Sequence, residues 1–352
     1  MTEQIISVIE SPILIPSLSG GRQTVPLRRA GFLKKLRFHY TATLNVTAFT
    51  SAPSRSAFGV LGGGISRLRV EANGKIPLFD LTGKGLVVWT EIQNRDGTLL
   101  TLPSAKAQTY PLAADFTSYP AISGTGTVTV TDATELNFMI PVYVRGILTE
   151  LGLVLLQNEA LDIGVEVVFN PLYSPTVTND ALYSGGTLTV SMGTPSQLEV
   201  ERESYTVPSN PRDFPDTRWV HQVLEFNQPI SGGFFRFEVP RAGLLLRAVI
   251  RIEDAAGAPV ELAGSDRFRV IYGANEVVVD RFYRHIRPEY VFDYSRLPPR
   301  GVAVIDFYKW GFETLRLAKN TEVLANLAIE GTVASGAMAM ITLERLMPVV
   351  AV

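Results

Sequence analysis

The chain has 352 residues, of which 46% are hydrophobic and 19% charged, so it is long and apolar enough to fill the cores of two domains. This composition excludes a mainly disordered chain, and 29 glycines and 22 prolines are too few for a collagen-like or low-complexity protein. The 32 basic and 34 acidic residues give a formal net charge of −2, which excludes the global basic field that drives non-specific binding to nucleic acid.

The absence of cysteine excludes disulfides, thiol catalysis, iron–sulfur clusters and cysteine-based zinc sites. The segment before Pro16 holds Glu3 and Glu10 but no basic residue, so we expect no signal peptide and synthesis in the cytoplasm. Nowhere does the chain reach the roughly 18 uninterrupted apolar residues of a membrane-spanning helix. We therefore expect a protein that does not cross a membrane.

Most of the chain alternates between segments rich in β-forming residues and clusters of turn residues. Turns are indicated by clusters such as Asn73–Gly74 and Gly232–Gly233. A helical pattern occurs only at residues 85–94 and at residues 281–291, where Pro288 is expected to interrupt it. The spacing predicts an all-β sandwich protein rather than a parallel α/β enzyme. Strands are predicted, in chain order, at residues 33–46, 125–131, 138–144, 165–169, 187–192 and 277–279.

Charge is distributed unevenly along the chain. Residues 1–70 hold nine basic and two acidic side chains, residues 71–240 hold nine and 19, and residues 241–352 hold 14 and 13. The segment between Ser11 and Val70 contains no acidic residue, so its basic residues could form a patch that contacts the phosphates of nucleic acid or lipid. A solvated strand face is the alternative. The candidate residues are Arg22, Arg28, Arg29, Lys34, Lys35 and Arg37.

Three short patterns occur twice and in the same order along the chain. They are Ser-Gly-Gly followed by Arg-Ala-Gly, then Arg-x-Arg-Val, then Tyr-x-x-Gly-x-x-Thr. Because the matches are collinear, we interpret them as a duplicated domain, with coincidence among β-rich segments as the alternative. The matches pair residues 19–31 with 231–243, residues 67–70 with 267–270, and residues 143–149 with 308–314.

The two copies differ in length, which locates insertions in the first. The extra residues are assigned to loops at 47–64 and 94–131, and both loops are expected to project from the same end of the molecule. Three prolines between positions 208 and 215 indicate an extended linker between the copies. We therefore expect an N-terminal arm at residues 1–19, a first domain at 20–207, a linker at 208–218 and a second domain at 219–352.

The sequence contains no recognisable catalytic constellation. The three histidines, His39, His221 and His285, are scattered and lack metal-ligand spacing, so a structural role is favoured for each. No HExxH, GxSxG or Walker pattern occurs, and residues 62–64, three glycines, are interpreted as a turn. We expect no cofactor and no metal site.

Two residue types leave alternatives open. Glu199, Glu201 and Glu203 alternate on one predicted strand face, where a solvated face is favoured over the paired carboxylates of a glycosidase. The tryptophans could stack on sugars or bases, although core packing is the commoner role for an isolated tryptophan. They are Trp89, Trp219 and Trp310.

The arrangement resembles the double jelly-roll major capsid proteins of tailless icosahedral viruses, the lineage that includes adenovirus hexon. The resemblance covers nearly the whole chain and depends on two tandem eight-stranded sandwiches with few helices and unequal loops. The Arg-Ala-Gly repeats, the Asn73–Gly74–Lys75 turn and the closing segments at residues 324–333 and 338–346 are similar to that family without being specific to it.

The resemblance implies a homotrimer whose six jelly rolls form a pseudo-hexagonal capsomer in the shell of a virion. Its implied partners are neighbouring capsomers, penton or minor capsid proteins, and internal membrane lipid or genome near the N-terminal region. In that case the six basic candidates would partly line an inward face, and the alternative is that some of them flank strand ends and stay solvated. A trimeric receptor-binding spike and a carbohydrate-active β-sandwich protein are the alternatives.

Overall fold

A computed structural model gives the fold of the chain as two compact units. The first consists of Met1–Val142 and Val154–Phe214, and the second of Tyr143–Leu153 and Pro215–Val352. The structure describes residues 5–15, 19–47, 54–55, 58–74, 76–93, 130–145, 150–157, 162–175, 181, 183–185, 189–193, 196–273, 276–294, 297–307, 318–322 and 326–349.

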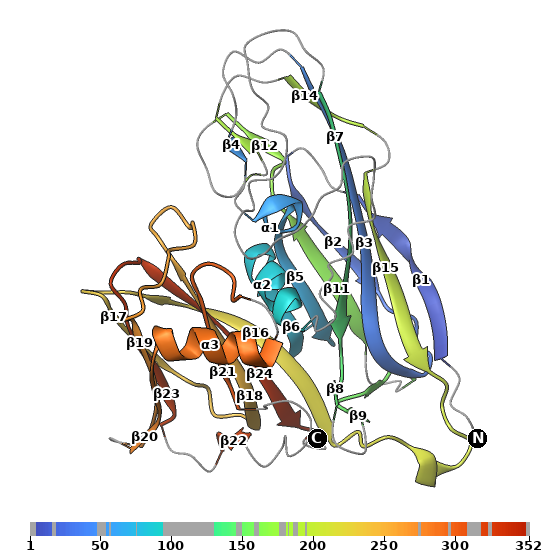
Figure 1. Ribbon diagram of the computed structural model, residues 1–352. Coiled ribbons are helices and arrows are strands. Elements are labelled where there is room, and N and C mark those ends of the chain that lie inside the picture. The colour runs from blue at the N-terminus through green and yellow to red at the C-terminus, as the bar shows by residue number, and fades with distance from the viewer. Residues whose placement is uncertain are drawn as a thin grey trace. The chain divides into compact units, whose positions relative to one another are not determined.

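Eight strands of the first unit form two antiparallel sheets (Figure 1). One sheet has the order β1 (Ile5–Leu14), β15 (Gln197–Tyr205), β3 (Phe32–Thr47) and β7 (Val130–Pro141). The other has the order β2 (Gly21–Pro26), β11 (Ile163–Phe169), β5 (Ile65–Ala72) and β6 (Ile76–Thr82). Short strands add to this framework: β10 (Val154–Leu155) and β14 (Thr189–Met192) pair with β3, while β4 (Ser54–Arg55), β13 (Tyr183–Ser184) and β12 (Tyr173–Ser174) pair together.

The second unit repeats this arrangement. One of its sheets has the order β16 (Trp219–Pro229), β24 (Met338–Pro348), β18 (Leu244–Glu253) and β21 (Val302–Asp306). The other has the order β17 (Phe234–Glu238), β23 (Ala328–Thr332), β19 (Arg267–Tyr272) and β20 (Glu276–Phe282). The short strand β22 (Lys319–Asn320) pairs with β18, and β8 (Val144–Arg145) pairs with β9 (Glu150–Leu151).

The strand order in both units is that of a jelly roll. When these eight strands are numbered along each unit, one sheet has the order 1-8-3-6 and the other 2-7-4-5. The predicted fold class, all-β with two tandem eight-stranded jelly-roll sandwiches and few short helices, is confirmed.

Two of the three sequence matches fall on equivalent structural positions. Arg67 on β5 forms an ion pair with Asp80 on β6, and Arg267 on β19 pairs with Asp280 on β20 in the same way. Gly31 and Gly243 each have a positive φ and lie just before the third strand of their unit. The third match lies largely outside the described residues, because residues 146–149 and 308–314 are not among them.

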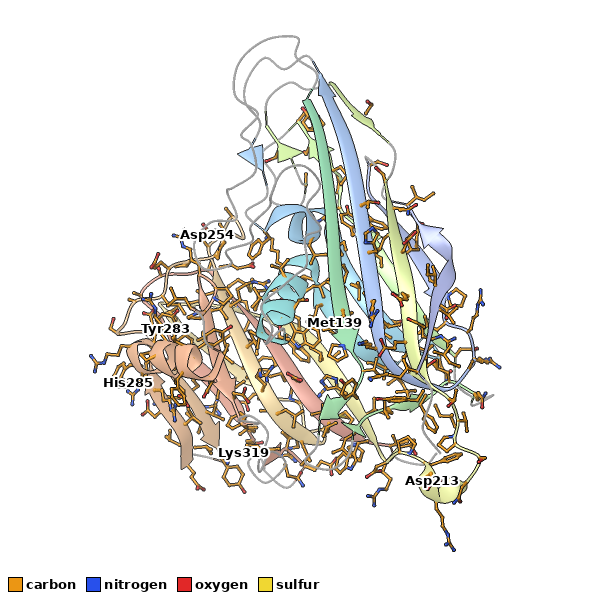
Figure 2. All side chains as sticks on the ribbon, turned by 45° about the vertical axis from the view of Figure 1, so that its right-hand side comes forward. Met139, Asp213, Asp254, Tyr283, His285 and Lys319 are labelled. Carbon is orange, nitrogen blue, oxygen red and sulfur yellow. The ribbon has the colours of Figure 1, made fainter. Side chains whose placement is uncertain are left out.

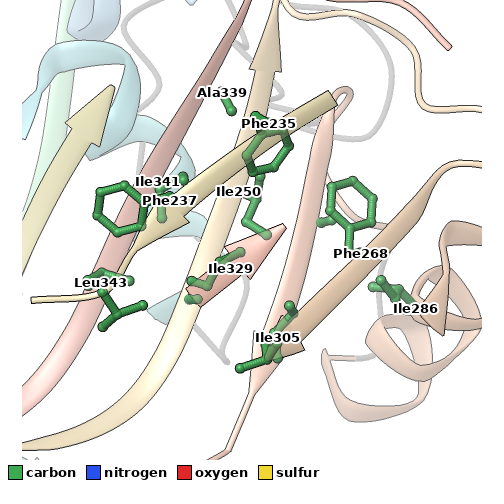
Figure 3. Packing of buried hydrophobic residues seen from close by; sticks show 14 of the residues in the cluster. Phe235, Phe237, Ile250, Phe268, Ile286, Ile305, Ile329, Ala339, Ile341 and Leu343 are labelled. Atoms are coloured by element: carbon green, nitrogen blue, oxygen red, sulfur yellow. The ribbon is translucent and has the colours of Figure 1, made fainter. Parts of the chain in front are cut away.

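The core of the second unit shows why alternating sequences produce a sandwich. Alternate residues of β18 from Ala248 to Ile252 belong to one buried cluster with Phe235, Phe268 and Ile329 of the other sheet, and Figure 3 shows Ile250 among them. Because side chains alternate across a strand, one face of each sheet is apolar and the two apolar faces pack together. In the first unit, Phe38 on β3 stacks on Phe138 on β7 with ring centroids 4.7 Å apart.

The described helices lie in loops between strands. They are α1 (Gly59–Gly64), α2 (Gly83–Gln93), α3 (Tyr283–Tyr294) and the short 3-10 helix η1 (Pro211–Asp213). The α2 and α3 helices follow equivalent hairpins, β5–β6 and β19–β20, and both helical predictions are confirmed. Pro288 lies inside α3 without ending it, so the predicted interruption is wrong.

Several expectations are corrected. The segment expected to be an arm contains β1, which pairs with β15 from Ile5 to Leu14, because its backbone groups complete the edge of the sheet. The glycines at 62–64 belong to α1 and not to a turn. The helix α1 packs on α2, and Lys84 of α2 lies over the ring of Phe58, the residue before α1. This part of the first insertion therefore folds back on its own unit instead of projecting.

The second insertion lies almost wholly outside the described residues, since residues 94–129 are not among them. The division between the units falls between Phe214 and Pro215, within the segment expected to be a linker. The remaining domain boundaries stay predictions.

Candidate functional site

The six basic candidates lie on β2, on β3 and in the loop between them, and all of them have acidic partners. Arg22 on β2 pairs with Glu166 on β11. Arg28 Nε lies 3.5 Å from Glu10, and Arg29 Nε donates to Asp162 at 3.0 Å. Lys34, Lys35 and Arg37 all pair with one residue of β15, Glu203.

Glu203 is the centre of this charge network. Its carboxylate lies 3.6 Å from Lys34 Nζ, 3.0 Å from Lys35 Nζ and 2.7 Å from an Arg37 nitrogen, and its side chain is only 5% exposed. A buried carboxylate is costly unless cations and hydrogen bonds compensate it. The lysines and arginine of β3 therefore stabilise the pairing of β3 with β15.

A second buried pair anchors β1. Arg202 on β15 donates to Glu10 at 2.9 Å, and both side chains are almost fully buried. The same guanidinium donates to the backbone carbonyl of Ala30, and Arg28 approaches Glu10 from the solvent side. This network ties the edge strand and the β2–β3 loop together.

The acid-free stretch of the sequence is thus not an uncompensated basic surface. The acids that pair with the six candidates come from sequence positions before Ser11 or after residue 161, which a count within the stretch cannot reveal. Of the six candidates, Arg22 and Arg28 are the most exposed, with side-chain exposures of 67% and 63%. The alternating glutamates of β15 were the sequence signal that acidic partners for the basic residues exist. The expected solvated face is wrong for one of them, Glu203, which is buried.

The second unit holds a more deeply buried set of charges on the equivalent sheet. Arg247 on β18 lies 3.1 Å from both Asp306 on β21 and Glu344 on β24, and Glu344 also contacts His221 Nε2 at 3.1 Å. All four side chains are less than a tenth exposed. Nearby, Arg251 pairs with Glu225 at 3.1 Å and with Glu253 at 2.7 Å.

The other candidates for chemistry are dispersed. His39 is half-buried on β3, His221 belongs to the buried set above, and His285 is exposed on α3 (Figure 2). In the described part of the chain, no three histidine, aspartate or glutamate side chains form a group that could hold a metal ion. Trp89 is buried on α2 against Phe79, as expected for a core residue.

A small cavity lies between α3 and the strands β20 and β21. Its volume is about 60 Å³, which is far below the roughly 300 Å³ or more of a typical ligand pocket. Arg281 and Glu289 pair beside it. Burial, and secondarily the charge of Asp306, raise the pKa of the Asp293 carboxyl above its ordinary value.

Among the described residues, no helix is long and apolar enough to span a membrane.

Comparisons with known proteins identify the fold. The chain matches no protein-family model and no curated protein sequence. Its structure is similar to that of the STIV major capsid protein, with a TM-score of 0.69 and 11% identity over 97% of this chain and 96% of that chain. It is also similar to the major capsid protein P2 of bacteriophage PM2, with a TM-score of 0.56 and 12% identity over 99% of this chain and 98% of that chain.

A further similar structure is that of PBCV-1 VP54 fitted into a reconstruction of the virophage Sputnik. It has a TM-score of 0.62 and 8% identity over 98% of this chain and 94% of that chain. At these identities the similarity shows a shared fold. The expected resemblance to double jelly-roll major capsid proteins is therefore confirmed at the level of the fold.

Proposed function

We propose that this protein is a viral major capsid protein, a structural component that assembles with copies of itself into the shell of a virion. The observation that carries the proposal is that nearly the whole chain, both jelly rolls included, aligns with nearly the whole of the STIV major capsid protein. A shared single domain would be weak evidence, because one fold serves many functions. A shared tandem arrangement over nearly the full length of both chains is a more specific similarity.

In this proposal the assembly unit is a homotrimer. Three chains with two similar sandwiches each provide six similar units, which a threefold axis can arrange as a pseudo-hexagonal capsomer. Such capsomers tile an icosahedral shell together with neighbouring capsomers and with penton or minor capsid proteins. The proposal requires no reaction and no cofactor.

Among the six basic candidates, the two most exposed are the ones able to contact a partner. Arg22 and Arg28 keep most of their side-chain surface in solvent despite their acidic partners. We propose that this region faces the interior of the shell, near lipid or genome. Its charge there is moderate, since every candidate is already paired.

Light scattering of the purified protein, followed by electron microscopy of concentrated samples, tests the function. We expect a mass three times that of the 38.5 kDa chain and hexagonal particles in projection. A monomer mass at micromolar concentration, unchanged by salt, would contradict the proposal.

A further inference from the structure

Equivalent faces of the two units differ sharply in exposure. On the outer side of the sheet β1-β15-β3-β7, one row of side chains crosses all four strands: Ile9, Glu201, Arg37 and Met139. We call this row the sheet face. Ile9 and Met139 are exposed apolar side chains, and Arg37 is half exposed (Figure 2 labels Met139).

The corresponding row of the second unit is buried. By strand order and register it consists of Glu225, Thr342, Val249 and Val304. Each of these side chains is less than a tenth exposed. The same position in the fold is therefore covered in one repeat and open in the other.

The helices show the opposite difference. The outward side of α2 carries Val87, Val88 and Ile92, all buried, and α1 packs on this helix. The equivalent positions of α3, 200 residues further along the chain, are Arg287, Pro288 and Phe292. All three side chains are exposed to solvent, and Phe292 is 88% exposed. Among the described residues, the loop between β18 and β19 contains no counterpart of α1.

We call the outward side of α3, with Arg284, Arg287, Val291 and Phe292, the helix face. Large exposed apolar side chains on a soluble protein mark interaction surfaces when they lie together, as Val291 and Phe292 do. The charges of the two faces are also complementary. The helix face carries Arg284 and Arg287, while β15 offers Glu201 within the sheet face, 3.7 Å from Arg37, and Glu199 beside it.

We propose that the helix face of one copy packs on the sheet face of the next copy of this chain, with Phe292 against Met139 and α3 extending across the row towards Ile9. The occupant of each open face is then a second copy, and one contact covers both. Because the two faces differ, the contact is head to tail and closes into a ring when three copies meet. This inference rests on the proposed function, since it names the surfaces that join the proposed capsomer.

Two single variants and one control test the contact. Phe292→Asp removes the helix face and Met139→Asp removes the sheet face. Phe234→Asp is the matched control, because Phe234 is an exposed aromatic residue on β17, at the other end of its sheet from β20. Removal of a central aromatic or apolar anchor is expected to raise the dissociation constant of the trimer at least about 30-fold.

We expect each face variant to be monomeric by light scattering at a concentration where the wild type and the Phe234→Asp variant are trimers. A single cooperative thermal unfolding transition of the monomers will show that they are folded, although it should lie below that of the trimer because association stabilises the folded state. An equimolar mixture of the two face variants retains one intact helix face and one intact sheet face, so it should form a particle of two chains.

Other outcomes are distinguishable. Trimers of either face variant, or a mixture that stays monomeric, would overturn this inference while leaving the proposed capsid function intact. A monomeric wild type would overturn the proposed function, and this inference with it. Dissociation of the Phe234→Asp control would also overturn the assignment of the contact to these two faces.

Discussion

Lys35 and Arg247 occupy the same position in two repeated sandwiches. Lys35 on β3 lies 3.0 Å from Glu203 on β15, and Arg247 on β18 lies 3.1 Å from Glu344 on β24. In both units the cation is on the third strand and the carboxylate on the last, directly opposite in the register. An ion pair between central strands fixes the register, because a slip of one residue would send one partner into the apolar core.

The Glu203→Gln variant is expected to destabilise the first unit. The substitution leaves Lys34, Lys35 and Arg37 without their shared buried carboxylate. We expect a loss of about 1–3 kcal/mol, below the value for a fully buried pair because Arg37 is half exposed. A fall in the midpoint of urea unfolding measures the effect.

Glu238→Gln serves as the control for that variant. Glu238 is exposed and pairs with Arg236 at 2.7 Å. Exposed pairs contribute roughly 0–1 kcal/mol, so the midpoint should change little. Equal shifts for the two variants would show that the Glu203 network has no special role.

The fold could be predicted from sequence because its signals are local and repeated. Alternating β-forming residues and turn glycines predicted strands such as β3 and β11, and the collinear matches predicted the duplication. The edge strand β1 was missed because its partner is nearly two hundred residues away, so no local pattern marks it as part of a sheet. The helix α1 was missed because glycine-rich segments are poor helix formers, and its helical state depends on packing against α2.

Gly243→Ala is predicted to be strongly destabilising. Gly243 has φ +62°, and a Cβ there would lie 2.0 Å from the carbonyl oxygen of Leu346 on β24. The backbone strain alone costs about 1–2 kcal/mol, and the collision with a sheet backbone adds to it. We expect a variant that is insoluble or unfolds at a much lower temperature.

Gly74→Ala separates strain from collision. Gly74 has φ +61°, but no atom lies within 4 Å of the position of an added Cβ. This variant should lose only about 1 kcal/mol in thermal unfolding. If Gly243→Ala were as mild as Gly74→Ala, the close approach of the β17–β18 loop to β24 would be wrong.

Asp293→Asn is predicted to stabilise the protein at neutral pH. Burial, then the charge of Asp306, raise the pKa of Asp293 above the ordinary value of 3.8. Between the ordinary pKa, which applies to the unfolded state, and the raised pKa of the folded state, the folded state binds more protons than the unfolded state. The free energy of unfolding therefore falls as the pH rises through that interval. The variant should have a higher Tm than the wild type at pH 7 and the same Tm below the ordinary value.

Asp280→Asn should show the opposite sign. The hydrogen bond from Arg267 lowers the pKa of Asp280, so its contribution to stability is present above the ordinary value and is lost as the pH falls through the lowered pKa. The Tm of this variant should lie slightly below that of the wild type at pH 7 and should match it in strong acid. Calorimetry at several pH values checks both signs.

The candidate basic surface was only partly predictable for a physical reason. The sequence identifies which side chains are basic. The net charge of the region around them depends also on the acidic residues that the fold brings next to them from β1, β11 and β15. Arg29, for example, meets Asp162, which is 133 positions away. Local charge counts therefore overestimate the field of a segment in a sheet protein, where neighbours come from distant strands.

The triple variant Arg22→Gln, Arg28→Gln and Arg29→Gln tests the proposed inward surface. Each guanidinium is paired, yet attraction to a membrane at a distance depends on the summed charge, so the substitutions still remove three positive charges from this region. Glu10 keeps its buried partner Arg202, and the amide introduced by Arg22→Gln can still donate a hydrogen bond to the buried Glu166, so the fold should survive. We expect an intact trimer with weaker binding to anionic vesicles at low salt, by at most about 1 kcal/mol per residue, and a difference that fades as salt is added. Substitution of Arg236, Arg267 and Arg300 by Gln makes the same change of charge on the second unit and should have a smaller effect on vesicle binding. Equal effects of the two sets, or loss of the trimer in the first, would show that the arginines near β2 do not form the surface that faces lipid or genome.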